Sequence, residues 1–409
     1  MQNKSFRREG PRSSSSSRPA FRSGGSHRPS GRGGNRGGGR GGERIDISRF
    51  INKAVITEET DHFVPEHAFS DFLITDTLKE AIKVKGYVHP SPIQDRTIPY
   101  ILKGHDLVGI ANTGTGKTAA FLIPLINKVL LNRKEKILIL VPTRELAVQI
   151  DDELRTFTKR MKIFSVCCVG GAGIGKQIRD LRYENNFIIG TPGRIKDLLM
   201  RKALFLRDFN TIVLDEADRM LDMGFVADMR FVVAGMPKEH HSLFFSATLS
   251  HAIEVLITEF LKSPIRISVK TRDTSKQVDQ DVVRVGGSNS KMDVLQDLLA
   301  NPEFKKVLIF GRTKHGVERL TKDLALKGFK AESIHGNKTQ SNRQRALGQF
   351  KNNTIQILVA TDVAARGLDI ADVSHVINYE IPATYDDYIH RIGRTGRAGK
   401  RGKALTFIG

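Results

Sequence analysis

Residues 106–131 read DLVGI ANTGTGKT AAFLIPLINKVLL, which is a short apolar run, a glycine-rich loop and a longer apolar segment. The first run predicts a buried strand, and residues 119–131 have the periodicity and length of a helix. A glycine-rich loop between a strand and a helix lets backbone N–H groups approach phosphates, and the positive end of the helix dipole faces the same anion. The stretch therefore predicts an α/β unit whose loop binds the phosphates of a nucleotide.

The side chains of this loop suit that ligand. Lys117 would neutralise the β- and γ-phosphates, and the Thr118 hydroxyl would bind Mg²⁺, although Ala111 stands where the usual pattern begins with glycine. A second segment, residues 170–177, fits the pattern through its lysine but ends in Gln177 where a metal-binding hydroxyl is needed. We therefore assign the nucleotide to the first loop. Its binding residues are Thr113, Gly114, Thr115, Gly116, Lys117 and Thr118.

Two acidic residues, Asp215 and Glu216, follow the apolar run 211–214, at the place where ligands of open α/β sheets gather. One carboxylate there can hold Mg²⁺ while its neighbour orients or deprotonates the attacking water. We assign Asp215 to the metal and Glu216 to the water. The alternative is an acidic helix start that the helix dipole stabilises, and the phosphate loop upstream favours the catalytic interpretation.

Short apolar runs alternate with longer helical segments along most of the chain, a rhythm typical of βαβ units. The further strands that we predict are residues 137–141, 211–214, 306–310, 355–359 and 375–379. We therefore predict an α/β protein of two domains, each with a mostly parallel sheet flanked by helices. The first domain is expected over residues 45–269, a linker over 270–278 and the second domain over 279–409.

The first 44 residues differ in composition from the rest. They hold ten Arg and one Lys against two Glu, a net charge of +9 out of +21, together with eleven Gly and nine Ser. Such a segment cannot bury enough apolar surface to offset its ordering entropy, so residues 1–44 predict a disordered basic tail. Its Arg-Gly-Gly-like tracts favour RNA binding over a solubilising leader or an organelle transit peptide, because the Gly and Pro content opposes an amphipathic helix.

Composition also excludes several classes of protein. No apolar run approaches the roughly 20 residues that span a bilayer, so we expect no membrane partner. Cys167 and Cys168 are the only cysteines, which excludes a disulfide scaffold and a cysteine zinc site and favours a cytoplasmic location. We interpret both as small core residues of a strand.

Taken together, the motifs resemble the DEAD-box family of ATP-dependent RNA helicases from about residue 69 onward. The similar segments are Gly86-Tyr87 with Pro90-Ser-Pro-Ile-Gln94, the loop at 111–118, Asp215-Glu-Ala-Asp218, Ser246-Ala-Thr248, residues 361–369 and residues 390–397. Residues 218–225, 312–316 and 335–338 are most similar to the bacterial RhlE-type branch. The resemblance implies two RecA-like domains that bind ATP and Mg²⁺ between them and grip single-stranded RNA or short duplexes largely independently of sequence.

The resemblance also implies a role for individual residues. Gln94 would read the adenine edge, Phe69 would stack on the ring, and Asp369 would contact the ribose. Arg394 and Arg397 would act as arginine fingers on the γ-phosphate. Residues that would couple hydrolysis to strand separation are Asp218, Ser246, Thr248 and His390. Residues that would contact the RNA backbone are Pro142, Thr143, Arg144, Gly171, Thr191, Gly193, Arg194, Arg312, Thr313, Gln340, Arg343, Thr361 and Arg366.

These features predict an enzyme that couples ATP hydrolysis to local unwinding or remodelling of RNA and RNA–protein complexes and acts as a monomer. The rival interpretations are a DNA helicase and an ATP-gated RNA clamp that does not unwind productively. The RhlE-type branch implies ribosome assembly or RNA turnover. Family members usually continue with at least one more helix beyond residue 409, so we expect either a fragment or a second domain with one sheet face less covered.

Overall fold

Two parallel β-sheets, one from each half of the chain, carry the residues singled out above. The computed structural model describes residues 46–53, 63–112, 114–269, 278–286, 290–365, 370, 372–396 and 402–408. The predicted basic tail, residues 1–44, lies outside them. We call residues 63–269 lobe 1 and residues 278–408 lobe 2, and describe each by itself.

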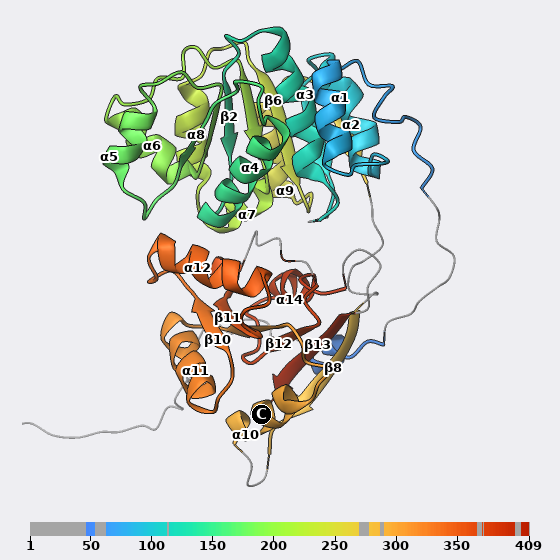
Figure 1. Cartoon of the computed structure of the whole chain (residues 1–409), viewed down its shortest axis with the longest axis vertical. Coiled ribbons are helices and arrows are strands. Elements are labelled where there is room, and N and C mark those ends of the chain that lie inside the picture. The colour runs from blue at the N-terminus through green and yellow to red at the C-terminus, as the bar shows by residue number, and fades with distance from the viewer. Residues whose placement is uncertain are drawn as a thin grey trace, which may run out of the picture. The chain divides into compact units, whose positions relative to one another are not determined.

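Lobe 1 alternates strands and helices as its sequence rhythm predicts (Figure 1). Its elements are α1 (Asp76–Val84), α2 (Pro92–Leu102), β1 (Leu107–Ile110), α3 (Lys117–Leu131), β2 (Ile137–Leu140), α4 (Arg144–Phe157), β3 (Ser165–Cys168), α5 (Ile174–Asp180), β4 (Phe187–Gly190), α6 (Pro192–Met200), β5 (Thr211–Leu214), α7 (Ala217–Asp222), α8 (Val226–Ala234), β6 (His241–Ser246), α9 (His251–Phe260) and β7 (Ile265–Ser268). The strand order is β3-β4-β2-β5-β6-β1-β7. Neighbouring strands pair in parallel, so their carboxyl ends share one edge.

Both faces of the lobe 1 sheet are buried under helices. Ile137 and Ile139 of β2 pack with α1 to α4 on one face, whereas Leu138 and Leu140 pack with α6 to α9 on the other. Successive side chains of a strand point to opposite faces of the sheet, so a strand buried on both faces is apolar at every position. The sheet therefore exposes the loops at its carboxyl edge, where the predicted nucleotide and RNA residues lie.

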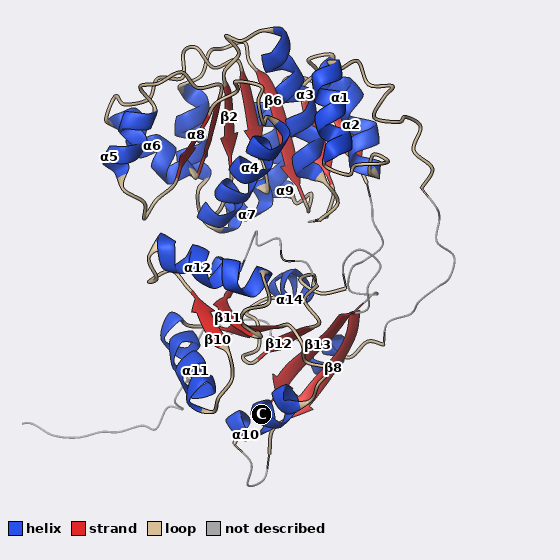
Figure 2. Cartoon of the chain, viewed as in Figure 1, coloured by secondary structure: helices blue, strands red, loops and turns tan. Residues whose placement is uncertain are grey.

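Lobe 2 has the same architecture (Figure 2). Its elements are β8 (Val278–Arg284), α10 (Lys291–Ala300), β9 (Val307–Gly311), α11 (Lys314–Leu326), β10 (Ala331–Ile334), α12 (Gln340–Lys351), β11 (Ile357–Thr361), α13 (Asp362–Ala365), β12 (His375–Asn378), α14 (Tyr385–Ile392) and β13 (Gly402–Ile408). The parallel sheet has the order β10-β11-β9-β12-β13-β8. Helices α10 and α11 cover one face, and α12, α13 and α14 cover the other.

The structure thus confirms the α/β class, both parallel sheets and each predicted strand to within two residues. Residues 270–277 of the expected linker lie outside the described part of the chain, and Val278 already begins β8. A short 3-10 helix (Ile47–Phe50) precedes lobe 1 in the sequence but packs on lobe 2, where Asn52 bridges to Gln280.

The two cysteines are core residues of β3, as predicted. Cys168 is buried on one face of the sheet, Cys167 packs partly buried against the other, and neither forms a disulfide. Burial raises the pKa of both thiols, that of Cys168 to about 12, so neither is a reactive thiolate at neutral pH. None of the described helices has the length and apolar character to cross a membrane.

Candidate nucleotide and RNA site

The loop after β1 has the geometry of a phosphate cradle. Gly114 and Gly116 have φ angles of 83° and 93°, a left-handed conformation that favours glycine, and Gly116 directly precedes α3. Lys117 is 6% exposed, and its Nζ donates to the Ala111 carbonyl oxygen at 2.8 Å. The ammonium group is therefore held inside the loop, while Thr118 lies in the first turn of the helix. Thr113 lies outside the described residues.

The acidic pair sits at the end of β5 on the same edge of the sheet. Asp215 and Glu216 are 2% and 5% exposed. Burial raises the pKa of Asp215 to about 7, while the nearby Lys117 ammonium acts in the opposite direction. Glu216 adopts a left-handed φ of 52°, which is strained for a residue with a Cβ, and its carboxylate accepts a 2.7 Å hydrogen bond from Arg219 Nη1. The strained backbone and the buried Arg219 fix the direction of this carboxylate.

Asp218 joins the acidic segment to the end of β6. Its Oδ2 accepts from the backbone N–H groups of Ala247 and Thr248, both at 3.1 Å, and from the Thr248 hydroxyl at 3.3 Å. The Ser246 hydroxyl donates to the Thr248 carbonyl oxygen at 2.8 Å. The three lobe 1 residues that the resemblance implies for coupling, Asp218, Ser246 and Thr248, are therefore brought together.

Gln94 connects the predicted adenine-reading segment to the phosphate loop. Its Oε1 accepts from Ser91 N at 2.9 Å, completing the cap of α2, and its Nε2 donates to the Gly116 carbonyl oxygen at 3.1 Å. Phe69 is 6% exposed and packs edge-on against Phe72 and Tyr87, so its ring is part of the core in this structure. Both Gln94 and Phe69 would need to exchange these contacts for contacts with a base.

We expect Gln94→Ala to reduce the preference for ATP over GTP. An amide that donates and accepts at the adenine edge discriminates against the wrong base by about 1–3 kcal/mol, so the ratio of kcat/KM values should fall roughly 5- to 150-fold. Gln94→Glu is the matched control for the helix cap, because it keeps the acceptor for Ser91 N–H but loses the donor. Adenine reading predicts that both variants lose discrimination, whereas equal use of ATP and GTP by the unaltered protein would contradict the assignment.

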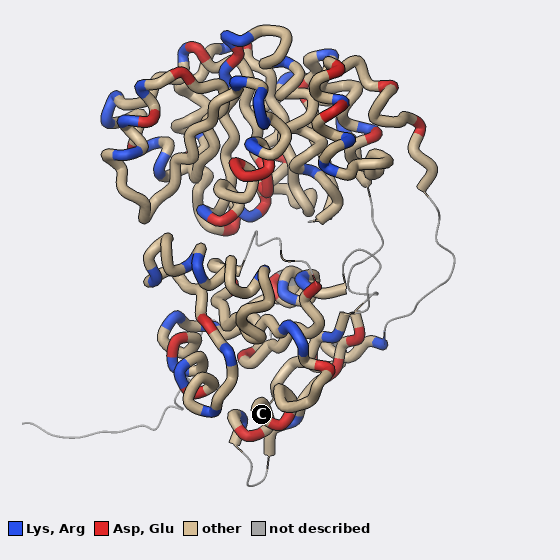
Figure 3. The backbone as a smooth tube through the Cα atoms, viewed as in Figure 1, with Lys and Arg blue, Asp and Glu red and all other residues tan. Residues whose placement is uncertain are grey.

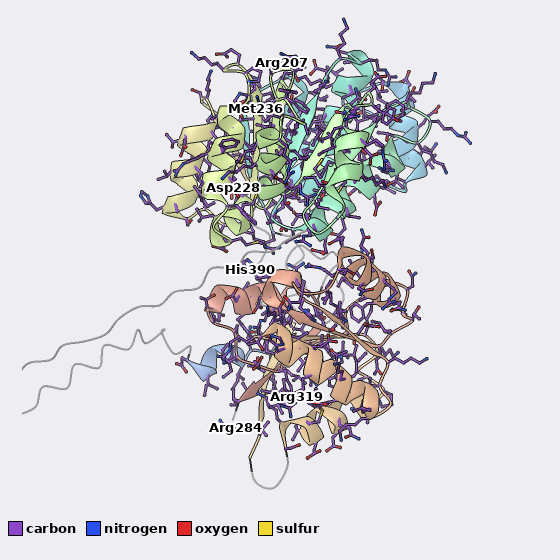
Figure 4. All side chains as sticks on the ribbon, turned by 90° about the vertical axis from the view of Figure 1, so that its left-hand side faces the viewer. Arg207, Asp228, Met236, Arg284, Arg319 and His390 are labelled. Carbon is purple, nitrogen blue, oxygen red and sulfur yellow. The ribbon has the colours of Figure 1, made fainter. Side chains whose placement is uncertain are left out.

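The RNA residues predicted in lobe 1 gather at the carboxyl ends of β2, β4 and β3. Thr143 caps α4, and the neighbouring Arg144 guanidinium lies so close to Gly171 that a Cβ on this glycine would clash with Nη1. Arg194 donates to the Ala172 carbonyl oxygen at 3.3 Å, which ties the start of α6 to the same loop. Other predicted residues of this group are Pro142, Thr191 and Gly193, and a Cβ on Gly193 would lie 3.5 Å from Oδ2 of Asp228, labelled in Figure 4.

The segment 170–177 resembles a phosphate-binding loop in sequence, but it lies among the predicted RNA residues of lobe 1. Gln177 Nε2 donates to the Val169 carbonyl oxygen at 3.0 Å, and its Oε1 accepts from Arg194 at 2.8 Å. These contacts hold the loop beside Arg144 and Arg194 and away from the loop after β1.

Lobe 2 arranges its predicted RNA residues in the same way, at the carboxyl ends of the neighbouring strands β10, β11 and β9. Arg312 and Thr313 follow β9, and Thr313 caps α11 by accepting from Gly316 N at 3.0 Å. Gln340 and Arg343 lie in the first turn of α12, and Thr361 ends β11. Helices α4, α6, α11 and α12 therefore all begin among these residues, and helix N-termini bind phosphate without reading bases. Lys, Arg, Asp and Glu are interspersed over both lobes (Figure 3).

The helix α14 carries His390, and Arg394 follows it. Arg394 is 3% exposed and lines a small pocket with Asp362, Asp387 and His390. The sequence motifs did not single out Arg391, which is 1% exposed and forms two hydrogen bonds with the Asp362 carboxylate at 2.5 and 2.8 Å. Arg391 also donates to the Glu380 carbonyl oxygen at 2.7 Å, so it fastens α14 to the segments that follow β11 and β12. Three predicted residues of this region, Arg366, Asp369 and Arg397, lie outside the described residues.

Sequence reasoning also missed Arg219, which lies three residues after Glu216 and pairs with it across one helical turn. The spacing of an acidic and a basic residue at i and i+3 is the signal that could have found it. For Arg391 and Asp362, 29 residues apart, no local spacing gives the pairing.

The residues of lobe 1 fit a nucleotide-bound magnesium ion. Mg²⁺ usually keeps several waters and is held by one or two protein oxygens plus phosphates, which Asp215 and the Thr118 hydroxyl would supply. Among the described residues, no group of three or more His, Cys, Asp or Glu could hold a metal by itself. Because the cation favours the deprotonated carboxylate, its binding would be coupled to loss of a proton from Asp215.

Comparison with known proteins gives matches over both lobes. Residues 91–256 match the DEAD/DEAH box helicase family, and residues 290–399 match the helicase conserved C-terminal domain. The DEAD-box ATP-dependent RNA helicase CshA of Streptococcus pneumoniae, strains TIGR4 and R6, is 45% identical over 344 residues, which are 83% of this chain and 65% of the relative. The chain thus spans about two thirds of the length of these curated relatives.

Solved structures agree with this match. Dbp5 of S. cerevisiae bound to RNA and ADP BeF3 is 30% identical, with a TM-score of 0.75 over 83% of this chain and 89% of that one. Mss116p bound to ssRNA and AMP-PNP is 31% identical, with a TM-score of 0.75 over 82% of this chain and 72% of that one. Since the folds, the family models and the sequence identity agree, the chain belongs to the DEAD-box family of RNA helicases.

Proposed function

We propose that this protein is an RNA-stimulated ATPase that couples ATP binding and hydrolysis to local unwinding or remodelling of RNA duplexes and RNA–protein complexes. One observation carries the proposal. In the lobe 1 sheet, the predicted nucleotide residues follow β1 and β5, the predicted coupling residues lie after β5 and at the end of β6 between them, and the predicted RNA residues follow the adjoining strands β3, β4 and β2. The two ligands would therefore bind side by side on one edge of one sheet.

Different side chains carry out the separate steps of ATP binding and hydrolysis. Lys117 and the N-terminus of α3 bind phosphate charge, and Gln94 orients the base. Glu216, aimed by Arg219, orients the attacking water and accepts its proton. Arg394, with Arg397, stabilises charge that develops on the γ-phosphate, which a magnesium ion held by Asp215 and Thr118 would also neutralise. Asp218 transmits changes at the acidic segment to Thr248 through its hydrogen bonds.

We further propose that the protein acts in the cytoplasm as a monomer. The unpaired cysteines on β3 support a reducing compartment. The similarity of residues 218–225, 312–316 and 335–338 to the RhlE-type branch supports a role in ribosome assembly or RNA turnover, while the bacterial relatives reported above carry the name CshA.

We expect single-stranded RNA to stimulate ATP hydrolysis, and DNA of matched sequence to do so weakly or not at all. Allosteric coupling of two ligands is typically worth about 5- to 150-fold in affinity and is reciprocal, so RNA should tighten ATP binding by the factor by which a non-hydrolysed ATP analogue tightens RNA binding. The measurements are ATPase rates with a panel of RNA and DNA strands and the two titrations.

The same panel, together with an assay of multiple-turnover strand separation, tests the rival functions. Equal stimulation by DNA would identify a DNA helicase, because the protein would then make no use of the 2′-hydroxyl. Stimulation by RNA without multiple-turnover strand separation would identify an RNA clamp. Hydrolysis that no nucleic acid affects would contradict the proposal.

A further inference from the structure

The segment 46–53 precedes lobe 1 in the sequence but is an integral part of lobe 2. Phe50 is 0% exposed and belongs to the same buried cluster as Val278, Tyr388 and Ile392. Its ring centroid lies 4.7 Å from that of Tyr388, at an interplanar angle of 56°. In Figure 1 this segment, coloured blue, lies beside β8.

The backbone of the segment also extends the sheet. Asn52 N–H donates to the Gln280 carbonyl oxygen at 3.0 Å, and Gln280 N–H donates to the Asn52 carbonyl oxygen at 2.7 Å. Strand β8 is the last in its sheet and pairs with β13 along its other side, so Asn52 occupies an otherwise open edge. This is the geometry by which an extended peptide adds to a sheet edge, with one side chain as the anchor.

A closed set of contacts links the segment to α14. Tyr388 is 0% exposed, and its hydroxyl donates to Gln280 Oε1 at 2.9 Å. Gln280 is the residue that pairs with Asn52, and Tyr388 is the residue that contacts Phe50. Tyr388 lies on α14, two residues before His390 of the same helix and six residues before Arg394, which follows the helix. The position of α14 therefore depends in part on a segment from the opposite end of the chain.

We propose that residues 46–53 form a clasp that docks on lobe 2 through Phe50, positions α14 for the reaction and joins the two lobes by a second covalent connection. Phe50 is then a positioning residue that acts through Tyr388. The inference rests on the proposed ATPase function for its effect on turnover, whereas the docking itself does not depend on that function.

The second connection follows from the order of the chain. The chain passes from the clasp to lobe 1 between Lys53 and Phe63, and from lobe 1 to lobe 2 between Val269 and Val278. At no more than roughly 3.6 Å per residue, these ten and nine steps can span about 36 and 32 Å. Two such connections raise the effective concentration of one lobe at the other above what a single linker gives. Release of the clasp would leave only the connection before Val278.

The test compares Phe50→Ala with Ile51→Ala in the full-length chain. Ile51 belongs to the same segment but is 50% exposed, so it is a matched control for loss of an apolar side chain. A misplacement of about 1 Å at a reacting group can cost 100-fold in rate, so we expect Phe50→Ala to lower kcat roughly 10- to 100-fold at saturating ATP and RNA. ATP affinity without RNA should stay unchanged, and Ile51→Ala should match the unaltered protein.

A cysteine pair tests docking without reference to activity. Asn52→Cys and Gln280→Cys would face each other in a hydrogen-bonded antiparallel pair, whose Cα atoms are about 5.5 Å apart, within disulfide range. With oxidised glutathione, mass spectrometry should find the 52–280 disulfide in good yield when Phe50 is present. Oxidation of the double-cysteine protein that also carries Phe50→Ala should raise its kcat above that of its own reduced form, which simple loss of folding would not produce.

Each outcome decides something. The clasp would be overturned if the double-cysteine protein that retains Phe50 formed no 52–280 disulfide. It would also be overturned if Phe50→Ala and Ile51→Ala gave equal disulfide yields in the double-cysteine protein and equal kcat values. A disulfide that forms readily while the unaltered protein shows no RNA-stimulated hydrolysis would instead refute the proposed function and leave the docking in place.

Discussion

Replacement of Glu216 by Gln should abolish ATP turnover while leaving ATP binding nearly intact. Glu216 is 5% exposed, has a left-handed backbone conformation and accepts a 2.7 Å hydrogen bond from Arg219. These features fix the orientation of its carboxylate. An amide of the same shape keeps the packing but cannot accept a proton. Because a positioned general base contributes roughly 10²- to 10⁴-fold, kcat should fall by about that factor. Steady-state hydrolysis and fluorescent-nucleotide titration measure the two quantities.

Lys117→Ala should behave differently, because the lysine binds phosphate charge and takes no part in proton transfer. Its ammonium is held inside the loop by the hydrogen bond that it donates to the Ala111 carbonyl oxygen, so its removal should weaken ATP binding as well as turnover. Glu239→Gln is a suitable control, since Glu239 is a surface acid whose side chain is 90% exposed in its pair with Lys262. Equal, near-normal turnover in the Glu216 and Lys117 variants would refute the division of roles.

The sequence predicts those parts of the site that are contiguous in the chain or lie at strand ends. A strand, a glycine-rich loop and a helix fix the position of Lys117, and a parallel sheet places the residues after the predicted strands β1, β2 and β5 on one edge without any distance being known. The contact between Asp218 and Thr248 depends on β5 and β6 being neighbours, a strand order that the structure shows and that the sequence pattern does not predict.

Contacts between residues far apart in sequence could not be derived in this way. Phe50 and Tyr388 are separated by most of the chain, and periodicity reveals that a residue is apolar but not which partner buries it. The left-handed conformation of Glu216 has no local signature either, because its strain is maintained by the packing around β5 and α7. The sequence also does not show that Phe69 packs against Phe72 and Tyr87. A base that stacked on the Phe69 ring would have to displace these core contacts.

Arg394→Ala should lower kcat by roughly 10³-fold or more, the contribution of an arginine finger in phosphoryl transfer. Arg394 is buried beside His390 and Asp362 at the end of α14, and Arg391 anchors that helix through its two hydrogen bonds with Asp362. An arginine finger acts on charge that develops during the reaction and adds little to the binding of the ground state. ATP affinity without RNA should therefore stay close to that of the unaltered protein.

Two further variants separate the finger from general effects of charge and folding. Arg394→Lys keeps the charge but loses the planar fork of donors, so it should recover only a small part of the rate. Arg319→Ala removes the same charge from α11, where the side chain is 86% exposed and lies 3.9 Å from Asp323, and turnover should not change (Figure 4). If Arg394→Ala weakened ATP binding and turnover in equal proportion, its guanidinium would bind the ground state and the transition state alike, and the finger assignment would fail.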